Sequence, residues 1–344
     1  MAFVAVRAYG DRVDEFVHQQ MVKRQIPGLA LTIVRGGKEI KTAAYGFANL
    51  ELKAKTKPET VFEIGSVTKQ FTAAGILLLA QDGDLTVDDK IAKFLPETPL
   101  AWTNITIRHL LTHTSGIKNY TGLNGFELTK HLTRQRFIEK LAPLPMDFEP
   151  GEKWKYCNSG YNLLGFIIEK VSGKKYWDFM GARVFGPLGM TSTTSRDPAR
   201  IVPNRADGYE LQNSVLANRD YDLTDIFSAG EIVSTVGNLA RWNSALHSDR
   251  LLLASSKEQM WTSGTLNDGK MHGYGFGWRV EPFEGHKNIG HSGSTSGFSA
   301  SLQRFPQDGI DVILLCNSGE EGVATRLARQ IAAFYFKPKK EESR

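Results

Sequence analysis

Segments typical of β-strands gather near the two ends of this chain, whereas helical patterns fill its middle. The strand-like segments are residues 30–34, 40–46, 298–302 and 310–316. Gly36-Gly37 separates the first two segments and is typical of a hairpin turn. Because every strand must pair with a neighbour, the simplest assembly is one antiparallel sheet to which both ends of the chain contribute.

Apolar positions at helical spacing predict helices over residues 12–24, 66–81, 160–171 and about 322–336. Short helices joined by loops rich in Gly and Pro are expected over 105–147. We therefore expect an α+β fold, in which the terminal helices flank the sheet and a mainly helical lobe lies beside it. The predicted sheet domain comprises residues 1–82 and 185–344, and the helical domain comprises residues 83–184. A cleft between two such lobes is the natural place for an active site.

Two polar segments lack these patterns. Residues from about 195 to 225 are rich in Asp, Asn, Arg and Pro, so we expect a long surface loop there. Residues 337–342 carry mixed charge and are interpreted as a solvated tail. The net charge is +5, but the other basic residues are scattered rather than clustered in a stripe. This distribution disfavours nucleic acid as a partner.

Several functional classes find no support in the sequence. No apolar run approaches the roughly 20 residues that a membrane-spanning helix needs. The first residues lack a small-residue cleavage site, so no signal peptide is expected and a cytoplasmic location is predicted. No zinc or nucleotide motif occurs, so we expect neither metal nor cofactor, and His109 and His113 are interpreted as structural. Cys157 and Cys316 are expected to be reduced thiols rather than a disulfide.

The first candidate for chemistry is Ser66-Val67-Thr68-Lys69, at the start of the predicted helix 66–81. Residues three apart lie on one helix face, so the Ser66 hydroxyl and the Lys69 amine can meet. Burial in an apolar wall would lower the Lys69 pKa from about 10.4 and make the amine a base for the hydroxyl proton. Taken alone, this spacing is more typical of an N-capping Ser or Thr beside a solvated lysine.

The second candidate is Tyr156-Cys157-Asn158, just before the predicted helix 160–171. A tyrosine hydroxyl near Lys69 could relay a proton to a leaving group, and the Asn158 amide could hold a substrate carbonyl. The alternative is equally concrete. Asn158 or its neighbour could cap the helix, and Tyr156 could be a partly buried aromatic residue.

The third candidate is Gly290-His291-Ser292-Gly293-Ser294, leading into the predicted strand 298–302. Its glycines would let a substrate lie along a strand edge, and the Ser294 N–H could donate to an oxyanion. The alternative is an ordinary edge strand that carries turn glycines and a hydrogen-bonded histidine.

The order S-x-x-K, Y-x-N and H-x-G, each at an element boundary, resembles the serine β-lactamase and penicillin-binding-protein superfamily. The resemblance is to its class C β-lactamase-like branch, which includes family VIII carboxylesterases, D-aminopeptidases and D,D-carboxypeptidases. It extends over nearly the whole chain through the shorter runs 62–66, 110–116, 148–151, 186–190, 228–230 and 274–278.

The resemblance implies a role for each motif residue. Ser66 would be acylated by the substrate carbonyl, Lys69 would be its base, and Tyr156 would shuttle the proton. Asn158 would contact the substrate or Lys69, and the N–H groups of Ser66 and Ser294 would form the oxyanion hole. Gly293 would leave room for the substrate.

His291 stands where the K-T-G form of the third motif has a lysine, and this difference bears on the substrate. A histidine with a pKa near 6.5 is mostly neutral at pH 7 and attracts a substrate carboxylate less than lysine does. We therefore expect a carboxylesterase for short-chain esters. A β-lactamase or D-amino-acid peptidase is the first alternative, and a non-turnover binding or sensor protein is the second.

Overall fold

A seven-stranded antiparallel sheet forms the centre of the protein. The computed structural model describes residues 2–124, 126, 133–219 and 224–337. The strand order is β3-β2-β1-β12-β11-β10-β9. The strands are β1 Gly28–Arg35, β2 Lys38–Asn49, β3 Ala54–Lys55, β9 Arg279–Phe283, β10 His286–Thr295, β11 Phe298–Phe305 and β12 Ile310–Cys316. Strand β1 pairs with β12 from Leu29 opposite Cys316 to Arg35 opposite Ile310. The prediction of one antiparallel sheet built from both chain ends is confirmed.

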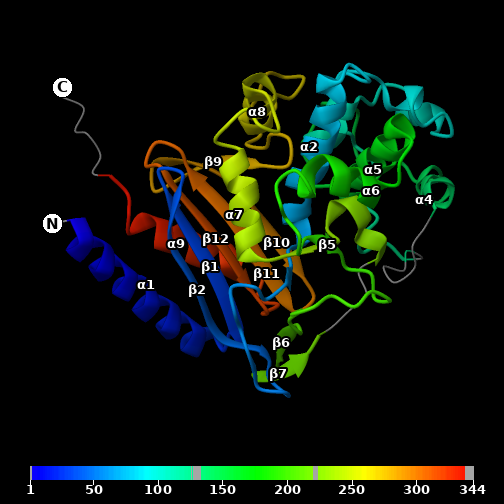
Figure 1. Ribbon diagram of the computed structural model, residues 1–344. Helices are drawn as coiled ribbons and strands as arrows, with labels where there is room; N and C mark the ends of the chain where they lie inside the picture. Colours follow the sequence, from blue (N-terminus) through cyan, green and yellow to red (C-terminus); the bar gives the residue numbers. More distant parts are fainter. Residues whose placement is uncertain (1, 125, 127–132, 220–223, 338–344) are drawn as a thin grey trace, which may run out of the picture.

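Helices cover both faces of this sheet. Helices α1 (Ala2–Arg24) and α9 (Val323–Ala333) lie on one face (Figure 1). There Leu31 and Leu314 of the sheet are buried with Leu327 of α9. The opposite face packs against α7 (Val236–Ala245), where the alternate strand residues Ala30 and Leu315 are buried. Because both faces are covered, β1 is buried along almost its whole length, which explains its continuous apolar sequence.

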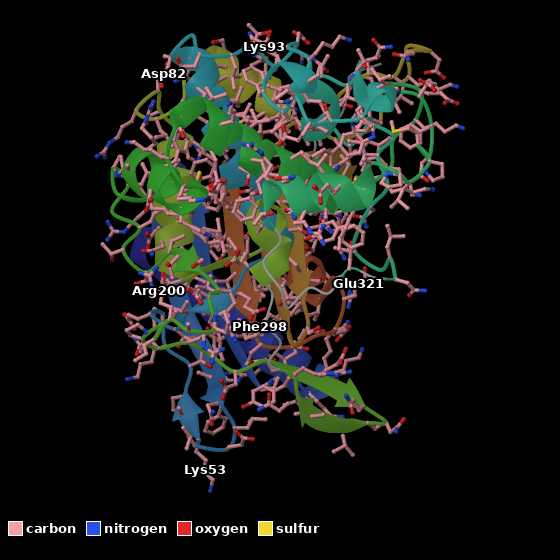
Figure 2. The ribbon with its side chains drawn as sticks, turned by 90° about the vertical axis from the view of Figure 1, so that its right-hand side faces the viewer. Lys53, Asp82, Lys93, Arg200, Phe298 and Glu321 are labelled. Carbon is pink, nitrogen blue, oxygen red and sulfur yellow. The ribbon has the colours of Figure 1, made fainter. Side chains whose placement is uncertain are left out.

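The helices between the two sheet-forming regions gather beside the sheet (Figure 1). They are α2 Thr68–Gln81, α3 Ile107–Leu111, α4 Arg134–Leu141, α5 Asn158–Ser172 and α6 Tyr176–Met180, with short turns at η1 Gly65–Val67, η2 Ile91–Lys93, η3 Leu100–Trp102 and the π-helical η4 Gly181–Phe185. A later helix, α8, spans Ala254–Trp261. Figure 2 shows Lys53, in the turn after β2, at the opposite end of the molecule from Asp82 and Lys93 of the helical part.

Two of the sequence predictions need correction. The segment 195–225 is not simply a loop, because it contains the hairpin β6 (Tyr209–Gln212) and β7 (Val215–Asn218); residues 220–223 lie outside the described part. It is followed by η5 Thr224–Ala229 and by β8 Ile232–Ser234, which pairs with β4 Phe62–Glu63 and β5 Thr194–Ser195. The run 290–294 does not precede a strand but lies within β10. Short cross-strand pairs of this kind leave little periodicity in the sequence.

The predicted division into domains stays a prediction. One continuous cluster of buried side chains runs from the sheet residues Ala30 and Leu315 into α2 and α5. Both cysteines are buried free thiols, as expected. In the described ranges no helix is long and apolar enough to cross a membrane, and no three His, Cys, Asp or Glu side chains group as metal ligands would.

Candidate active site

Ser66 and Lys69 meet at the start of the long central helix. Ser66 lies in the single turn η1 and is half-buried, and α2 follows directly from Thr68. The Lys69 Nζ atom lies 3.2 Å from Ser66 Oγ. This i, i+3 contact is the one that the motif predicts. The Ser66 side chain has no capping hydrogen bond to α2, whose N-cap is Val67, so the capping alternative is not what the structure shows.

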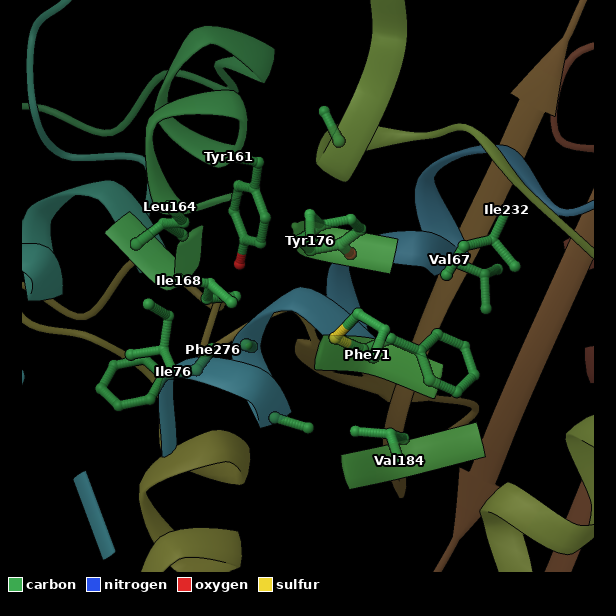
Figure 3. Close-up of a cluster of buried hydrophobic side chains, with 14 of the residues drawn as sticks. Val67, Phe71, Ile76, Tyr161, Leu164, Ile168, Tyr176, Val184, Ile232 and Phe276 are labelled. Carbon is green, nitrogen blue, oxygen red and sulfur yellow. The ribbon is translucent and has the colours of Figure 1, made fainter. Parts of the chain in front are cut away.

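Lys69 is completely buried, which is uncommon for a lysine. Its Nζ atom lies 2.7 Å from Asn158 Oδ1 and 2.8 Å from the Ala229 carbonyl oxygen. The rings of Tyr156 and Tyr161 lie 4.7 and 5.3 Å from it. Figure 3 shows the apolar side chains packed around α2, among them Phe71 from α2 and Tyr161 from α5. Burial holds the pKa of Lys69 well below its usual value, as expected from the sequence.

The partners of Lys69 define how its amine is oriented. Asn158 Oδ1 and the Ala229 carbonyl can only accept, so they take the two protons of a neutral amine. The remaining lone pair of Nζ is then left for the Ser66 hydroxyl, which can donate to it. In its neutral form, which the lowered pKa favours, the Lys69 amine would present this lone pair to the Ser66 proton.

Tyr156 lies beside this pair with its hydroxyl uncommitted. The residue is half-buried, but its hydroxyl oxygen is buried and has no hydrogen-bond partner in the described part of the structure. Burial raises the pKa of Tyr156, and the nearby Ser66 hydroxyl acts in the opposite direction without meeting hydrogen-bond geometry. The phenol is therefore protonated at neutral pH and free to engage an incoming group.

Asn158 is positioned by two side chains of the segment before it. Its Nδ2 donates to Thr121 Oγ1 at 3.2 Å, and its backbone N–H donates to Asn119 Oδ1 at 2.9 Å. These contacts direct Oδ1 of Asn158 toward Lys69. Helix α5 begins at Asn158 and its N-cap is Cys157, which has no side-chain cap bond, so Asn158 does not serve as the cap.

The third motif meets the first through backbone atoms. A Cβ atom on Gly293 would lie 1.9 Å from the Ile64 carbonyl oxygen and 3.2 Å from the Ser66 nitrogen. A Cβ atom on Gly65 would lie 2.8 Å from the Ser294 nitrogen. Only glycine allows so close an approach of two chains. It brings the backbone amides of Ser66 and Ser294 together, as an oxyanion hole made from their N–H groups requires.

His291 is held by the protein through both ring nitrogens. It is 2% exposed, and its Nδ1 lies 2.6 Å from the Ser292 carbonyl oxygen, which can only accept a proton. Its Nε2 therefore accepts from the Tyr274 hydroxyl at 2.8 Å. Burial lowers the pKa of His291 to about 3. The ring is neutral at pH 7 and offers no free N–H to a substrate.

Three groups of this site did not emerge from the sequence. The Ala229 carbonyl contacts Lys69 but carries no side-chain signal, although Ser228-Ala229-Gly230 belongs to the runs that support the resemblance. Asn119 and Thr121 lie in an irregular segment whose contacts no periodicity reveals. They could be found only once the fold placed them beside α5.

The chain is also similar to known proteins over most of its length. The family model described as Beta-lactamase matches residues 13–336. The chain belongs to this family. Within it, penicillin-binding protein 4* of Bacillus subtilis is 34% identical over 87% of this chain. The chain spans 70% of that relative's length, and 64% of the length of Protein flp of Staphylococcus aureus, which is 30% identical over 91% of this chain.

Solved structures of the family share the whole fold. An octameric penicillin-binding protein homologue from Pyrococcus abyssi superposes with a TM-score of 0.82 at 30% identity, over 94% of this chain and 76% of that one. A D-amino acid amidase from Ochrobactrum anthropi SV3 superposes with a TM-score of 0.81 at 25% identity, over 94% and 97%. The chain is thus a member of a serine hydrolase superfamily. The narrower likeness to the class C branch stays a prediction.

Proposed function

We propose that this chain is a carboxylesterase that hydrolyses short-chain esters through an acyl-enzyme on Ser66. The observation that carries the proposal is the buried Lys69, whose two acceptor partners leave one lone pair toward the Ser66 hydroxyl. A lysine without function is rarely buried at such cost, because desolvation of its amine is unfavourable.

The proposed acylation step uses this chain's own groups. Lys69 takes the Ser66 proton as Oγ attacks the ester carbonyl carbon, and the backbone N–H groups of Ser66 and Ser294 stabilise the oxyanion. Collapse of the tetrahedral intermediate breaks the bond to the alkoxide, which receives a proton through the Tyr156 hydroxyl. Water then attacks the acyl carbon by the same proton path in reverse, which releases the acid and restores Ser66.

Neutral esters suit this site because His291 supplies no charge. Its ring is buried and neutral, and both of its nitrogens are occupied by Ser292 and Tyr274. Esters also release an alkoxide more readily than amides release an amine, so they demand less of the proton donor. The proposed partner is accordingly a small neutral molecule met in the cytoplasm, and not a nucleic acid.

A second candidate is the hydrolysis of carboxylate-bearing amides, such as β-lactams or peptides that end in a D-amino acid. Arg279 at the start of β9 favours it, because this half-buried cation has no acidic partner within the described ranges. Its charge is close enough to lower the pKa of both Tyr156 and His291. Arg279, rather than His291, could therefore attract a carboxylate. The names of the penicillin-binding and amidase relatives point in the same direction.

A substrate panel separates these candidates. It comprises nitrophenyl acetate, butyrate and octanoate, a chromogenic cephalosporin, a D-alanyl-D-alanine peptide and D-phenylalanine amide, each run with the Ser66→Ala variant as a blank. We expect the highest kcat/KM with the short esters. A preference for the cephalosporin or peptide would support the second candidate and contradict the first. One stoichiometric burst without turnover on all six would indicate a sensor.

A further inference from the structure

His113, which lies outside the three motifs, contacts the residues on both sides of Tyr156. His113 follows α3 in the run Leu110 to Gly116 and is 1% exposed. Its carbonyl oxygen accepts the Lys155 N–H at 3.0 Å, and its Nδ1 accepts the Cys157 N–H at 3.1 Å. The backbone N–H groups of the two residues on either side of Tyr156 thus both donate to His113.

The ring of His113 also packs directly on the Tyr156 ring. Their centroids are 4.3 Å apart, and the tilt between the planes is 42°. Tyr161 and Tyr274 close the other sides of the His113 ring at 5.1 and 4.6 Å. Since the Tyr156 hydroxyl has no hydrogen-bond partner of its own in the described structure, packing and backbone contacts alone decide where it points.

His113 makes both contacts from an uncommon backbone conformation. Its φ of +61° lies in the left-handed region, which residues with side chains seldom adopt. In this conformation its carbonyl group and its imidazole reach the same neighbouring segment. Uncommon conformations of this kind persist where the surrounding structure demands them, and they concentrate at functional sites.

We infer that His113 is a positioning residue for Tyr156, holding the phenol over Ser66 and Lys69 through the Cys157 N–H and the stacked ring. The inference rests on the proposed function, because it acts only through proton transfer by Tyr156. His113 must accept at Nδ1 and so serves as a neutral imidazole, in keeping with burial, which lowers its pKa well below the usual value. No hydrogen bond joins His113 to Ser66 in the described structure, and His113 is not proposed as a catalytic group.

Two variants isolate the side-chain acceptor. Asn and Gly both tolerate a left-handed φ, but only Asn has an acceptor atom at the place of Nδ1. His113→Gly should lower kcat for a nitrophenyl ester by roughly 100-fold with little change in KM, the loss typical of a displacement near 1 Å. His113→Asn should recover activity to within about tenfold of the parent. Equal activity of the Gly and Asn variants would overturn the role of the acceptor.

A double-mutant cycle tests whether His113 acts through Tyr156. In a Tyr156→Phe background, His113→Gly should cost less than about threefold, because the group that it positions is already absent. An undiminished 100-fold loss in that background would overturn the inference. Ile138→Ala, which opens a cavity in α4, controls for general destabilisation and should leave kcat unchanged well below its melting temperature.

The rate of Ser66 modification by a fluorophosphonate keeps this test separate from the choice of substrate. If the parent is labelled but hydrolyses no ester, the esterase proposal fails, and the same cycle is then measured as labelling rates. Equal labelling rates for the parent and His113→Gly would contradict the positioning role. A parent that is not labelled at Ser66 would overturn both proposals.

Discussion

The active site buries one nitrogen base on its helix side, Lys69, and one on its strand side, His291. The two bases make different hydrogen bonds. On the helix side, Lys69 meets two acceptors and the Ser66 hydroxyl. On the strand side, His291 donates to its neighbour's carbonyl and accepts from the Tyr274 hydroxyl. Burial lowers the pKa of both groups, and at about 3 the pKa of His291 leaves its ring neutral at pH 7.

The two bases differ in the hydrogen-bonding capacity that their contacts leave free. A neutral amine with two acceptor partners retains one lone pair, and here that lone pair faces a potential nucleophile. An imidazole with one donor and one acceptor contact has nothing left to offer. Burial and a shifted pKa therefore do not suffice to identify a catalytic base, because the hydrogen bonds around the group decide whether it can take a proton.

The largest effect should come from the nucleophile on the helix side. Ser66→Ala should reduce turnover about a million-fold, by analogy with triad enzymes, while far-UV circular dichroism stays unchanged. The exposed Ser255→Ala variant is the control and should behave like the parent. Intact-protein mass spectrometry should find one fluorophosphonate adduct, and peptide mapping should place it on Ser66. A Ser66→Ala variant with a tenth of the activity would show that the chemistry lies elsewhere.

The proton-handling pair should give the next largest losses. Lys69→Met and Tyr156→Phe should each lower kcat by roughly 10²- to 10⁴-fold with little change in KM, since each removes a proton-transfer group. The double variant should lose little more than the worse single one. Tyr156→Phe should also not lower the melting temperature, because the deleted hydroxyl is buried without a hydrogen-bond partner in the described structure. Additive losses would mean that one of the two residues is only structural.

Charge on the strand side should have a smaller and selective effect. Arg279→Gln removes the half-buried cation of β9 and should reduce kcat/KM for a cephalosporin roughly five- to tenfold, as expected for an attraction near 1 kcal/mol. A neutral ester should not respond. His291→Lys is the matched variant, with a cation at the motif position itself. If His291→Lys raises cephalosporin turnover selectively and Arg279→Gln does nothing, His291 marks the carboxylate-facing position after all.

Local geometry explains what the sequence could predict. Ser66 in η1 and Lys69 at the start of α2 stand three residues apart, and the alternation in β11 and β12 follows from the pleat of a strand. Both patterns are therefore visible in a short stretch of sequence. The sheet made from both chain ends could be predicted because short strand-like segments lie near both ends of the sequence. The meeting of Gly65 with Gly293 could be anticipated only through the family resemblance, because 228 residues separate them.

Contacts that depend on the backbone could not be predicted in this way. The Ala229 carbonyl reaches Lys69 whatever side chain residue 229 carries. The Nε2 atom of His291 was assigned no partner in advance, because Tyr274 reaches it from the segment before β9. His113 was interpreted as structural, since its left-handed φ and its bond to Cys157 exist only in the fold. The hydrogen bonds that distinguish Lys69 from His291 are likewise contacts that exist only in the folded chain.

The last effect concerns stability rather than turnover, namely the contribution of His291 to the unfolding free energy as pH changes. In the fold its pKa is about 3, whereas an unfolded histidine titrates near 6.5. Between these values the unfolded chain takes up a proton that the folded chain refuses, so the His291 protonation lowers stability as pH falls. From pH 6 to pH 4.5 this amounts to about 2 kcal/mol of unfolding free energy. Other buried histidines, His113 among them, add to the acid sensitivity of the parent, so only a difference between proteins isolates His291.

That difference is measured against His291→Gln, whose amide can still donate and accept but does not titrate. Urea unfolding at pH 7, 6, 5 and 4.5 should show the variant less stable than the parent at pH 7. The gap should narrow by about 2 kcal/mol between pH 6 and pH 4.5, since only the parent loses the His291 contribution. A constant gap would mean that His291 titrates alike in the folded and unfolded chains. The His291 ring would then be charged below about pH 6.5. Its hydrogen bond from the Tyr274 hydroxyl, which requires a neutral ring, could not persist at those pH values.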